Sequence, residues 1–252
     1  MAKPTAYSPL DYVKPQPPPT VVLVHGAWHG PWAWDAVAER LASDGREAIA
    51  VDLPSAGAET GSLGDLYDDA RAVRAAVDAA GGPAVVVAHS YGGLPVTEGL
   101  AGCANAAHLV YLASFMLDEG QSLLGLRDGV EPDWWLTSED GRTLLPAEPR
   151  RVFYGDCDPA LAARAEAALV PQRKDAFRQQ LESVAWRETP SSYVICELDN
   201  AIPPAAQERM SARAGAVHRL PSGHSPFLSR PDDVCAIIRT LLDELAPAEQ
   251  RG

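Results

Sequence analysis

The stretch VVVAHSYGGLP, residues 85–95, places a serine directly after an apolar, β-branched run and directly before a pair of glycines. The run is typical of a buried strand, and a helix is expected to follow. Ala88 and Gly92 are small enough to let strand and helix pass closely around Ser90, as in a variant of the G-x-S-x-G turn that exposes a serine hydroxyl. The pattern favours a nucleophile at Ser90 over an incidental serine in a glycine-rich strand exit.

A serine hydroxyl needs a base to react at neutral pH. His224 lies in LPSGHSPFLSRP, a loop between the last predicted strand and the last predicted helix, where serine-dependent enzymes of this chain order present the imidazole. His224 is therefore the predicted base. We interpret the other five histidines as structural, and we expect His25 to brace a neighbouring loop. The two histidines of HGAWH lack the helical H-E-x-x-H context, so no metal site is predicted.

The imidazole needs a carboxylate to orient it. Asp199 follows the fifth predicted strand in VICELDNAIPP, 25 positions before His224, and is the predicted acid. Glu197 lies two residues earlier and is expected to point away within the strand. Asp118, after the fourth predicted strand, is the alternative.

Acyl transfer also needs hydrogen-bond donors that face the developing oxyanion. The N–H of Tyr91, the residue after the serine, is one predicted donor. The N–H of Ala27 is the other, because Gly26 lets the loop VHGAWHGPW turn after the first strand. The alternative for this loop is a plain strand-to-helix turn. Trp28, Trp32 and Trp34 are expected in the core or the pocket wall.

Six short apolar runs alternate with helical patterns along the chain. The strands and helices that they predict must bring these side chains together. The predicted strands are residues 20–25, 47–53, 84–89, 108–114, 192–198 and 216–220. Their unbroken apolar character predicts burial on both faces. Amphipathic patterns over 31–45, 66–81 and 230–246 predict helices. This rhythm predicts an α/β fold with a doubly wound, mostly parallel sheet of about six strands.

The rhythm breaks once, between residues 115 and 190, where no buried strand is evident. We predict a helical cap insertion there, over the carboxyl ends of the strands, where ligands bind in open α/β sheets. The predicted division is a proline-rich N-terminal arm (1–19), a first core part (20–114), the cap (115–190), a second core part (191–246) and a tail (247–252).

Composition limits the partners and the compartment. The 252 residues carry a formal net charge of −13, which argues against nucleic acid and anionic membranes. No signal-peptide pattern and no membrane-length apolar run is visible. The four scattered cysteines are therefore expected to be free thiols. We predict a cytoplasmic monomer or homodimer that acts on a small molecule.

These segments together resemble the α/β-hydrolase superfamily, and within it the small esterases related to plant methylesterases and hydroxynitrile lyases. The matching segments are VHGAWHGPWAWD, AVDLPSAG, VAHSYGGLP, VYLASFMLDEG, YVICELDNAIPPAAQ and GHSPFLSRPDDV. The resemblance implies a triad of Ser90, His224 and Asp199, no cofactor, and a cap over an apolar pocket. We expect Trp28, Tyr91, Trp134, Trp135 and Phe153 in that pocket.

The resemblance further implies that the lyases carry threonine and lysine at two positions that are Gly26 and Ser225 here. Hydrolysis of small, largely apolar carboxylic esters is therefore the predicted activity. A lyase or other non-hydrolytic enzyme on the same triad is one alternative, and a non-catalytic receptor for a small ligand is another. An epoxide hydrolase or dehalogenase of this fold would need aspartate where Ser90 stands.

Overall fold

A computed structural model describes residues 18–246. Six strands form one sheet in the order β2-β1-β3-β4-β8-β9, and every neighbouring pair is parallel. The strands are β1 (Thr20–Val24), β2 (Ala48–Val51), β3 (Ala84–His89), β4 (Ala106–Leu112), β8 (Ser191–Cys196) and β9 (Ala216–Leu220). The prediction of a six-stranded parallel α/β sheet is confirmed.

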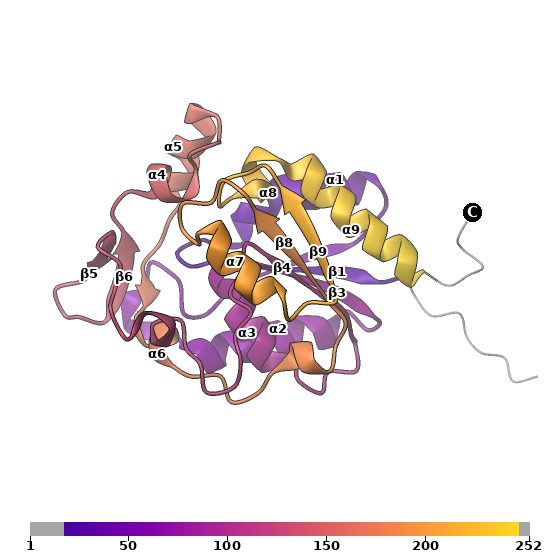
Figure 1. Ribbon diagram of the computed structural model, residues 1–252, viewed down its shortest axis with the longest axis horizontal. Coiled ribbons are helices and arrows are strands. Elements are labelled where there is room, and N and C mark those ends of the chain that lie inside the picture. The colour runs from indigo at the N-terminus through magenta and orange to yellow at the C-terminus, as the bar shows by residue number, and fades with distance from the viewer. Residues whose placement is uncertain (1–17, 247–252) are drawn as a thin grey trace, which may run out of the picture.

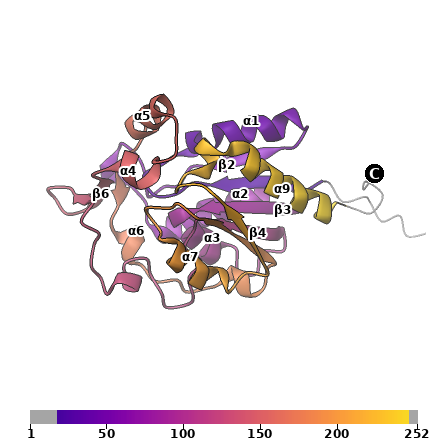
Figure 2. The same cartoon turned by 45° about the horizontal axis from the view of Figure 1, so that its top comes forward.

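Helices cover both faces of this sheet (Figures 1 and 2). One face packs on α1 (Asp35–Ser43), α8 (Pro226–Ser229) and α9 (Pro231–Leu245), and the other on α2 (Leu66–Ala79), α3 (Gly93–Gly99) and α7 (Pro204–Ser211). Alternate residues of a strand point to opposite faces. Val21 and Leu23 therefore pack in the core on the side of α1, α8 and α9, and Val22 and Val24 pack in the core on the side of α2, α3 and α7. The sheet is thus doubly wound.

The prediction that the strands are buried on both faces is correct for the central strands and wrong for the two edge strands. All residues of β1, β3 and β8 are buried, whereas β2 is mostly half-buried and β9 is mostly exposed. An edge strand has a neighbour on one side only, and the helices above and below reach it incompletely. An apolar run alone does not reveal its place in the sheet order.

The helix α2 shows how local sequence fixes an element. The Asp65 side chain accepts hydrogen bonds from the N–H groups of Tyr67 and Asp68, and the Asp68 side chain accepts one from the N–H of Asp65. This capping box satisfies backbone donors that a helix start leaves unpaired. The buried face of α2 includes one charged residue, Asp69, among apolar ones.

Most of the segment 115–190 lies beyond one end of the main sheet, and its last residues return along the sheet to the start of β8 (Figure 1). It holds α4 (Pro149–Phe153), α5 (Pro159–Ala167) and α6 (Asp175–Arg178). It also holds an antiparallel sheet of β5 (Trp135–Thr137), β6 (Thr143–Pro146) and β7 (Gln172–Arg173). This small sheet was not predicted, because strands of two to four residues are too short to show a periodic pattern.

The remaining regular elements are short 3₁₀ helices: η1 (Pro31–Trp34), η2 (Thr60–Ser62), η3 (Ser90–Gly92), η4 (Gly125–Arg127) and η5 (Ala185–Arg187). Within residues 18–246, no helix has the length and apolar character needed to cross a membrane. All four cysteines are free thiols. The tail and all of the predicted N-terminal arm except Pro18 and Pro19 lie outside the described residues.

Candidate active site

Ser90 is the first residue of η3 and lies at the sharp turn directly after β3. Its backbone is left-handed, with φ of 51°, a conformation that costs free energy in a non-glycine residue and has to be held by its surroundings. The Ser90 carbonyl accepts hydrogen bonds from the Phe115 N–H (3.1 Å) and the Ser114 hydroxyl (2.7 Å), both of which follow β4. The end of β4 therefore holds the turn in its strained form.

The helix after this turn needs glycine at its start. A Cβ added to Gly93 would lie 2.3 Å from the Phe115 carbonyl oxygen, and one added to Gly92 would lie 2.6 Å from the His25 carbonyl oxygen. Backbone atoms cannot give way as a side chain can. The two glycines thus allow the close passage that the sequence pattern predicts.

His224 and Asp199 form a buried pair beside the turn. His224 Nδ1 lies 2.8 Å from Asp199 Oδ2, and neither side chain is more than 2% exposed. The other carboxylate oxygen, Oδ1, accepts hydrogen bonds from the N–H groups of Ala201 (2.7 Å) and Ile202 (2.9 Å). The carboxylate is thereby fixed by its own loop before it meets the imidazole.

The two other acids considered for this position lie elsewhere. Glu197 is exposed on the loop after β8. Asp118 forms an ion pair with Arg187 on the surface. Only Asp199, of the three, contacts His224.

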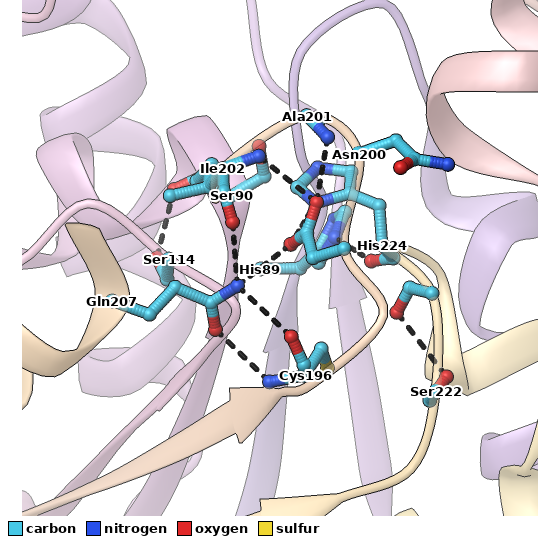
Figure 3. Close-up of polar contacts among 12 residues, drawn as sticks. His89, Ser90, Ser114, Cys196, Asn200, Ala201, Ile202, Gln207, Ser222 and His224 are labelled. Carbon is cyan, nitrogen blue, oxygen red and sulfur yellow. Dashed lines mark hydrogen bonds and ion pairs between the residues drawn. The ribbon is translucent and has the colours of Figure 1, made fainter. Parts of the chain in front are cut away.

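Gln207 on α7 supports the carboxylate, a role that was not predicted from the sequence. This fully buried side chain donates through Nε2 to Asp199 Oδ2 (2.9 Å) and to the Ile202 carbonyl (2.7 Å). It also accepts a hydrogen bond from the Cys196 N–H at 3.0 Å (Figure 3). A polar residue on the buried face of a short helix was the available signal.

His89, directly before Ser90, contacts the backbone of the loop that carries His224. Its Nε2 lies 2.8 Å from the His224 carbonyl oxygen, and its ring packs 4.6 Å from the His224 ring. Burial lowers the pKa of His89 well below its ordinary value, so this imidazole stays neutral. A neutral ring can donate from Nε2 to the carbonyl, which ties the His224 loop to the end of β3.

Ser90 and His224 line one cavity of about 520 Å³. No hydrogen bond between these two side chains is formed in this structure, and such contacts often tighten only when substrate binds. Ala27 and Tyr91 line the same cavity. Within the described chain, neither of their backbone N–H groups donates to another residue, so both are available to a ligand.

A buried polar network lies behind these amides. The Tyr91 hydroxyl and the Ser55 hydroxyl both donate to Asp69 Oδ2, each at 2.6 Å. Gln172 on β7 donates to the Ser55 hydroxyl and accepts from the Trp28 N–H, both at 2.9 Å. Burial raises the pKa of Asp69 to about 7. The network joins the Tyr91 side chain to the loop that holds Ala27 and Trp28.

The roles of Ser55, Asp69 and Gln172 were not predicted from the sequence. Asp69 gave a usable signal, because it falls on the apolar stripe of the helix 66–79 where a charged residue needs partners. Ser55 and Gln172 are separated by more than a hundred residues and gave none.

Aromatic side chains form the apolar wall of the cavity. Trp28 stacks on Phe153 and Phe177, with ring centroids 5.7 and 5.5 Å away. Trp134 and Trp135 meet Trp28 edge-on. The structure thus brings all five residues expected in the pocket, Tyr91 included, to one cavity, and it adds Phe177.

His25 and His29 are buried and hydrogen-bonded away from the cavity. His25 Nε2 accepts from the N–H of Leu53 after β2, and His29 lies between the Ala27 carbonyl and the Tyr154 hydroxyl. Residues 18–246 contain no group of three His, Cys, Asp or Glu side chains that could hold a metal ion.

A doubly wound parallel sheet that presents a serine turn at the end of its central strand is the architecture of the α/β hydrolases. A comparison with family models agrees: the Alpha/beta hydrolase family matches residues 21–237, and the chain belongs to this family.

The chain is also similar to individual members over nearly its whole length. It is 30% identical to the alpha/beta hydrolase nvfD of Aspergillus novofumigatus, over 90% of this chain and 97% of that protein. It is 28% identical to methylesterase 18 of Arabidopsis thaliana, over 90% and 98%. A pyrethroid hydrolase from Sphingobium faniae has the same fold, with a TM-score of 0.78 and 26% identity over 92% and 99%.

Proposed function

We propose that this protein is a serine esterase, with Ser90, His224 and Asp199 as its catalytic triad. The observation that carries this proposal is the strained left-handed turn at Ser90, which lines one cavity with an imidazole whose other nitrogen contacts a buried carboxylate. Relatives named methylesterase and pyrethroid hydrolase support an ester as the substrate. The aromatic wall favours a small, largely apolar ester.

The reaction runs in two halves. Ser90 Oγ attacks the ester carbonyl while its proton passes to His224 Nε2, and the imidazolium then gives that proton to the departing alcohol. Water enters, loses a proton to His224 and attacks the acyl-enzyme, which releases the carboxylic acid and restores the Ser90 hydroxyl. Asp199 holds the imidazole with Nδ1–H toward Oδ2 and stabilises the imidazolium. The cycle consumes one water and uses no cofactor.

The tetrahedral intermediates are anionic, and the amides of Ala27 and Tyr91 would bind the oxyanion. Both N–H groups lack an acceptor within residues 18–246, and both residues line the cavity beside Ser90. One donor of this kind contributes on the order of 10²–10³-fold in turnover.

Nothing in the site favours a lyase. A Cβ at Gly26 would lie 2.6 Å from His89 Nδ1, so the threonine expected of a lyase does not fit there without movement of that ring. Ser225, at the position expected to hold lysine, is fully buried.

Labelling with a fluorophosphonate and turnover of p-nitrophenyl esters test the proposal. Wild-type protein should bind one probe per chain and hydrolyse the esters. Ser90→Ala should lose labelling and at least about 10⁵-fold in kcat, because the other triad members cannot act without the nucleophile. Ser43→Ala, which removes an exposed hydroxyl on α1, is the matched control and should behave as wild type. Full-rate turnover by Ser90→Ala would refute the assignment.

A further inference from the structure

The cavity wall contains arginines but no acidic side chain. Arg127, Arg209 and Arg213 line it with apolar and aromatic residues, and no Asp or Glu of the described chain does. The whole chain has 34 acidic and 21 basic residues. A wall with arginine and without carboxylates therefore runs against the composition, and the cavity is locally cationic in an acidic protein.

These guanidinium groups also lack carboxylate partners. Most described arginines form ion pairs with Asp or Glu. Within residues 18–246 the arginines without such a pair are Arg127, Arg142, Arg164, Arg209 and Arg213, and the cavity takes three of these. No carboxylate of the described chain forms an ion pair with these three guanidinium groups, so an anionic ligand in the cavity would meet no competing acid there.

Arg209 and Arg213 are the pair best placed to act together. Arg209 is exposed near the end of α7, Arg213 lies in the turn two residues after this helix ends, and both line the cavity. Like charges that line one cavity repel each other. The neighbouring Glu208 does not neutralise this charge, because it forms an ion pair with Arg219 on β9.

Arg213 is held in place without being neutralised. Its Nη1 donates to the Met116 carbonyl at 3.1 Å, and its guanidinium lies 5.8 Å from the centre of the Trp186 ring. One hydrogen bond to a carbonyl leaves most of the five N–H donors of the group free. Arg213 is thus fixed beside Leu117, another residue of the cavity wall.

We propose that the natural substrate is an ester with an apolar body and a second, anionic group such as a carboxylate, and that Arg209 and Arg213 bind this group. The inference rests on the proposed esterase function and specifies its substrate class. The apolar body would lie against Trp28, Phe153 and Phe177, while the forked guanidinium donors match the two oxygens of a carboxylate.

The test compares two esters that differ only in charge: monomethyl octanedioate, and the same ester with its carboxylate replaced by a primary amide. The readout is the ratio of kcat/KM for the two esters, because a general folding defect lowers both values together. Wild-type protein should prefer the anionic ester about tenfold, through a lower KM. Addition of 0.5 M NaCl should reduce the preference, since salt screens exposed charges.

The double variant Arg209→Gln/Arg213→Gln should bring the ratio to about one. Arg213→Lys, which keeps the charge without the fork, should keep part of the preference. Arg164→Gln removes an exposed, unpaired arginine on α5 outside the cavity and should keep all of it. A wild-type ratio near one, or a double variant that retains the preference, would overturn the inference.

A binding measurement separates this inference from the proposed function. Calorimetry on Ser90→Ala, which binds without turnover, should show tighter binding of the anionic ester than of the amide, and loss of the difference when Arg209→Gln and Arg213→Gln are added. If wild type hydrolyses neither these esters nor p-nitrophenyl esters, the esterase proposal fails, while this titration still decides whether the arginines bind an anion.

Discussion

At the scale of single residues, the Asp199 carboxylate is held by more than the imidazole it would orient. Its two oxygens accept hydrogen bonds from the Ala201 and Ile202 amides and from Gln207 Nε2, in addition to the contact with His224. Hydrogen bonds of this kind stabilise the ionised carboxylate and fix its direction. The position of the predicted base therefore depends on α7, through Gln207.

This dependence predicts the effect of Gln207→Met, which keeps the length of the side chain and removes its amide. We expect kcat to fall by roughly tenfold while KM stays near its wild-type value, because the imidazole loses orientation and the cavity wall is unchanged. Asp199→Asn should be far more severe, at about 10⁴-fold in kcat, since it disturbs the tautomer of His224. Steady-state kinetics over a range of pH measures both.

Thermal unfolding is the control for these two variants. Gln207→Met leaves the buried Cys196 N–H without its acceptor, so some loss of stability is expected. A Gln207→Met protein that is folded at the assay temperature and keeps the wild-type kcat would show that Asp199 does not need this support.

The proposed triad could be predicted residue by residue because each member follows a strand end that the sequence marks locally. Ser90 follows a β-branched run, Asp199 follows another, and His224 sits in a loop between a strand and a helix. The sequence around Ser55 and Gln172 contains no pattern that would indicate their roles. Their roles arise from a contact that exists only once residues 117 positions apart have folded together.

At the scale of elements, the site depends on how closely α3 follows β3. Gly93 begins this helix against the backbone after β4, and the Ser90 carbonyl is bonded to that same backbone. The turn is thus a junction of three elements, and its strain is maintained by packing rather than by its own residues.

Gly93→Ala should therefore damage both stability and activity. Its Cβ would approach the Phe115 carbonyl oxygen to 2.3 Å and the Ser114 hydroxyl to 2.4 Å, so the backbone would have to move. We expect a loss of about 1–3 kcal/mol in the free energy of unfolding, together with a fall in kcat as Ser90 is displaced. Urea denaturation and ester turnover measure the two effects.

Gly61→Ala is the matched control for this overpacking. Nothing lies within 4 Å of a Cβ at this exposed position. The variant should unfold and turn over as wild type does. Equal stability of the Gly93→Ala and Gly61→Ala proteins would contradict the account of the turn.

Element type was predicted well in the main sheet and poorly in the segment 115–190. Long apolar runs and amphipathic stripes mark parallel strands and their helices directly. The short sheet of β5, β6 and β7 pairs residues up to 30 positions apart, and β7 is only two residues long. Tertiary contacts, not local preference, make such short strands, so the interpretation as a purely helical cap was incomplete.

At the scale of the whole molecule, buried titratable groups of opposite kind act on stability in opposite directions. Burial lowers the pKa of His25 to about 4 and that of His29 to about 3, and it lowers the pKa of His89 as well. Burial raises the pKa of Asp69 to about 7. Between about pH 4 and 7 the folded protein thus holds these imidazoles and the Asp69 carboxyl group in their neutral forms.

The sign of each contribution follows from proton binding. Between about pH 4 and 6.5 the unfolded chain binds protons on these histidines that the folded protein does not, so their contribution to stability rises with pH and is lost on acidification. Between about pH 4 and 7 the folded protein keeps a proton on Asp69 that the unfolded chain has lost, so this contribution falls as the pH rises. The contributions of three histidines, His25, His29 and His89, together exceed the opposite contribution of Asp69. We therefore expect a net loss of stability as the pH falls from 6.5 to 5.

Two variants should move this pH dependence in opposite directions. His29→Gln removes one group that resists protonation and should reduce the slope of unfolding free energy against pH, near pH 5.5, by up to about 1.4 kcal/mol per pH unit. Asp69→Asn removes the opposing group and should make the slope steeper by a similar amount. Urea denaturation at half-unit steps from pH 5 to 6.5 measures both slopes. If Asp69→Asn leaves the slope unchanged, Asp69 is ionised in the folded protein over this range of pH, and its assignment as a neutral carboxyl group is wrong.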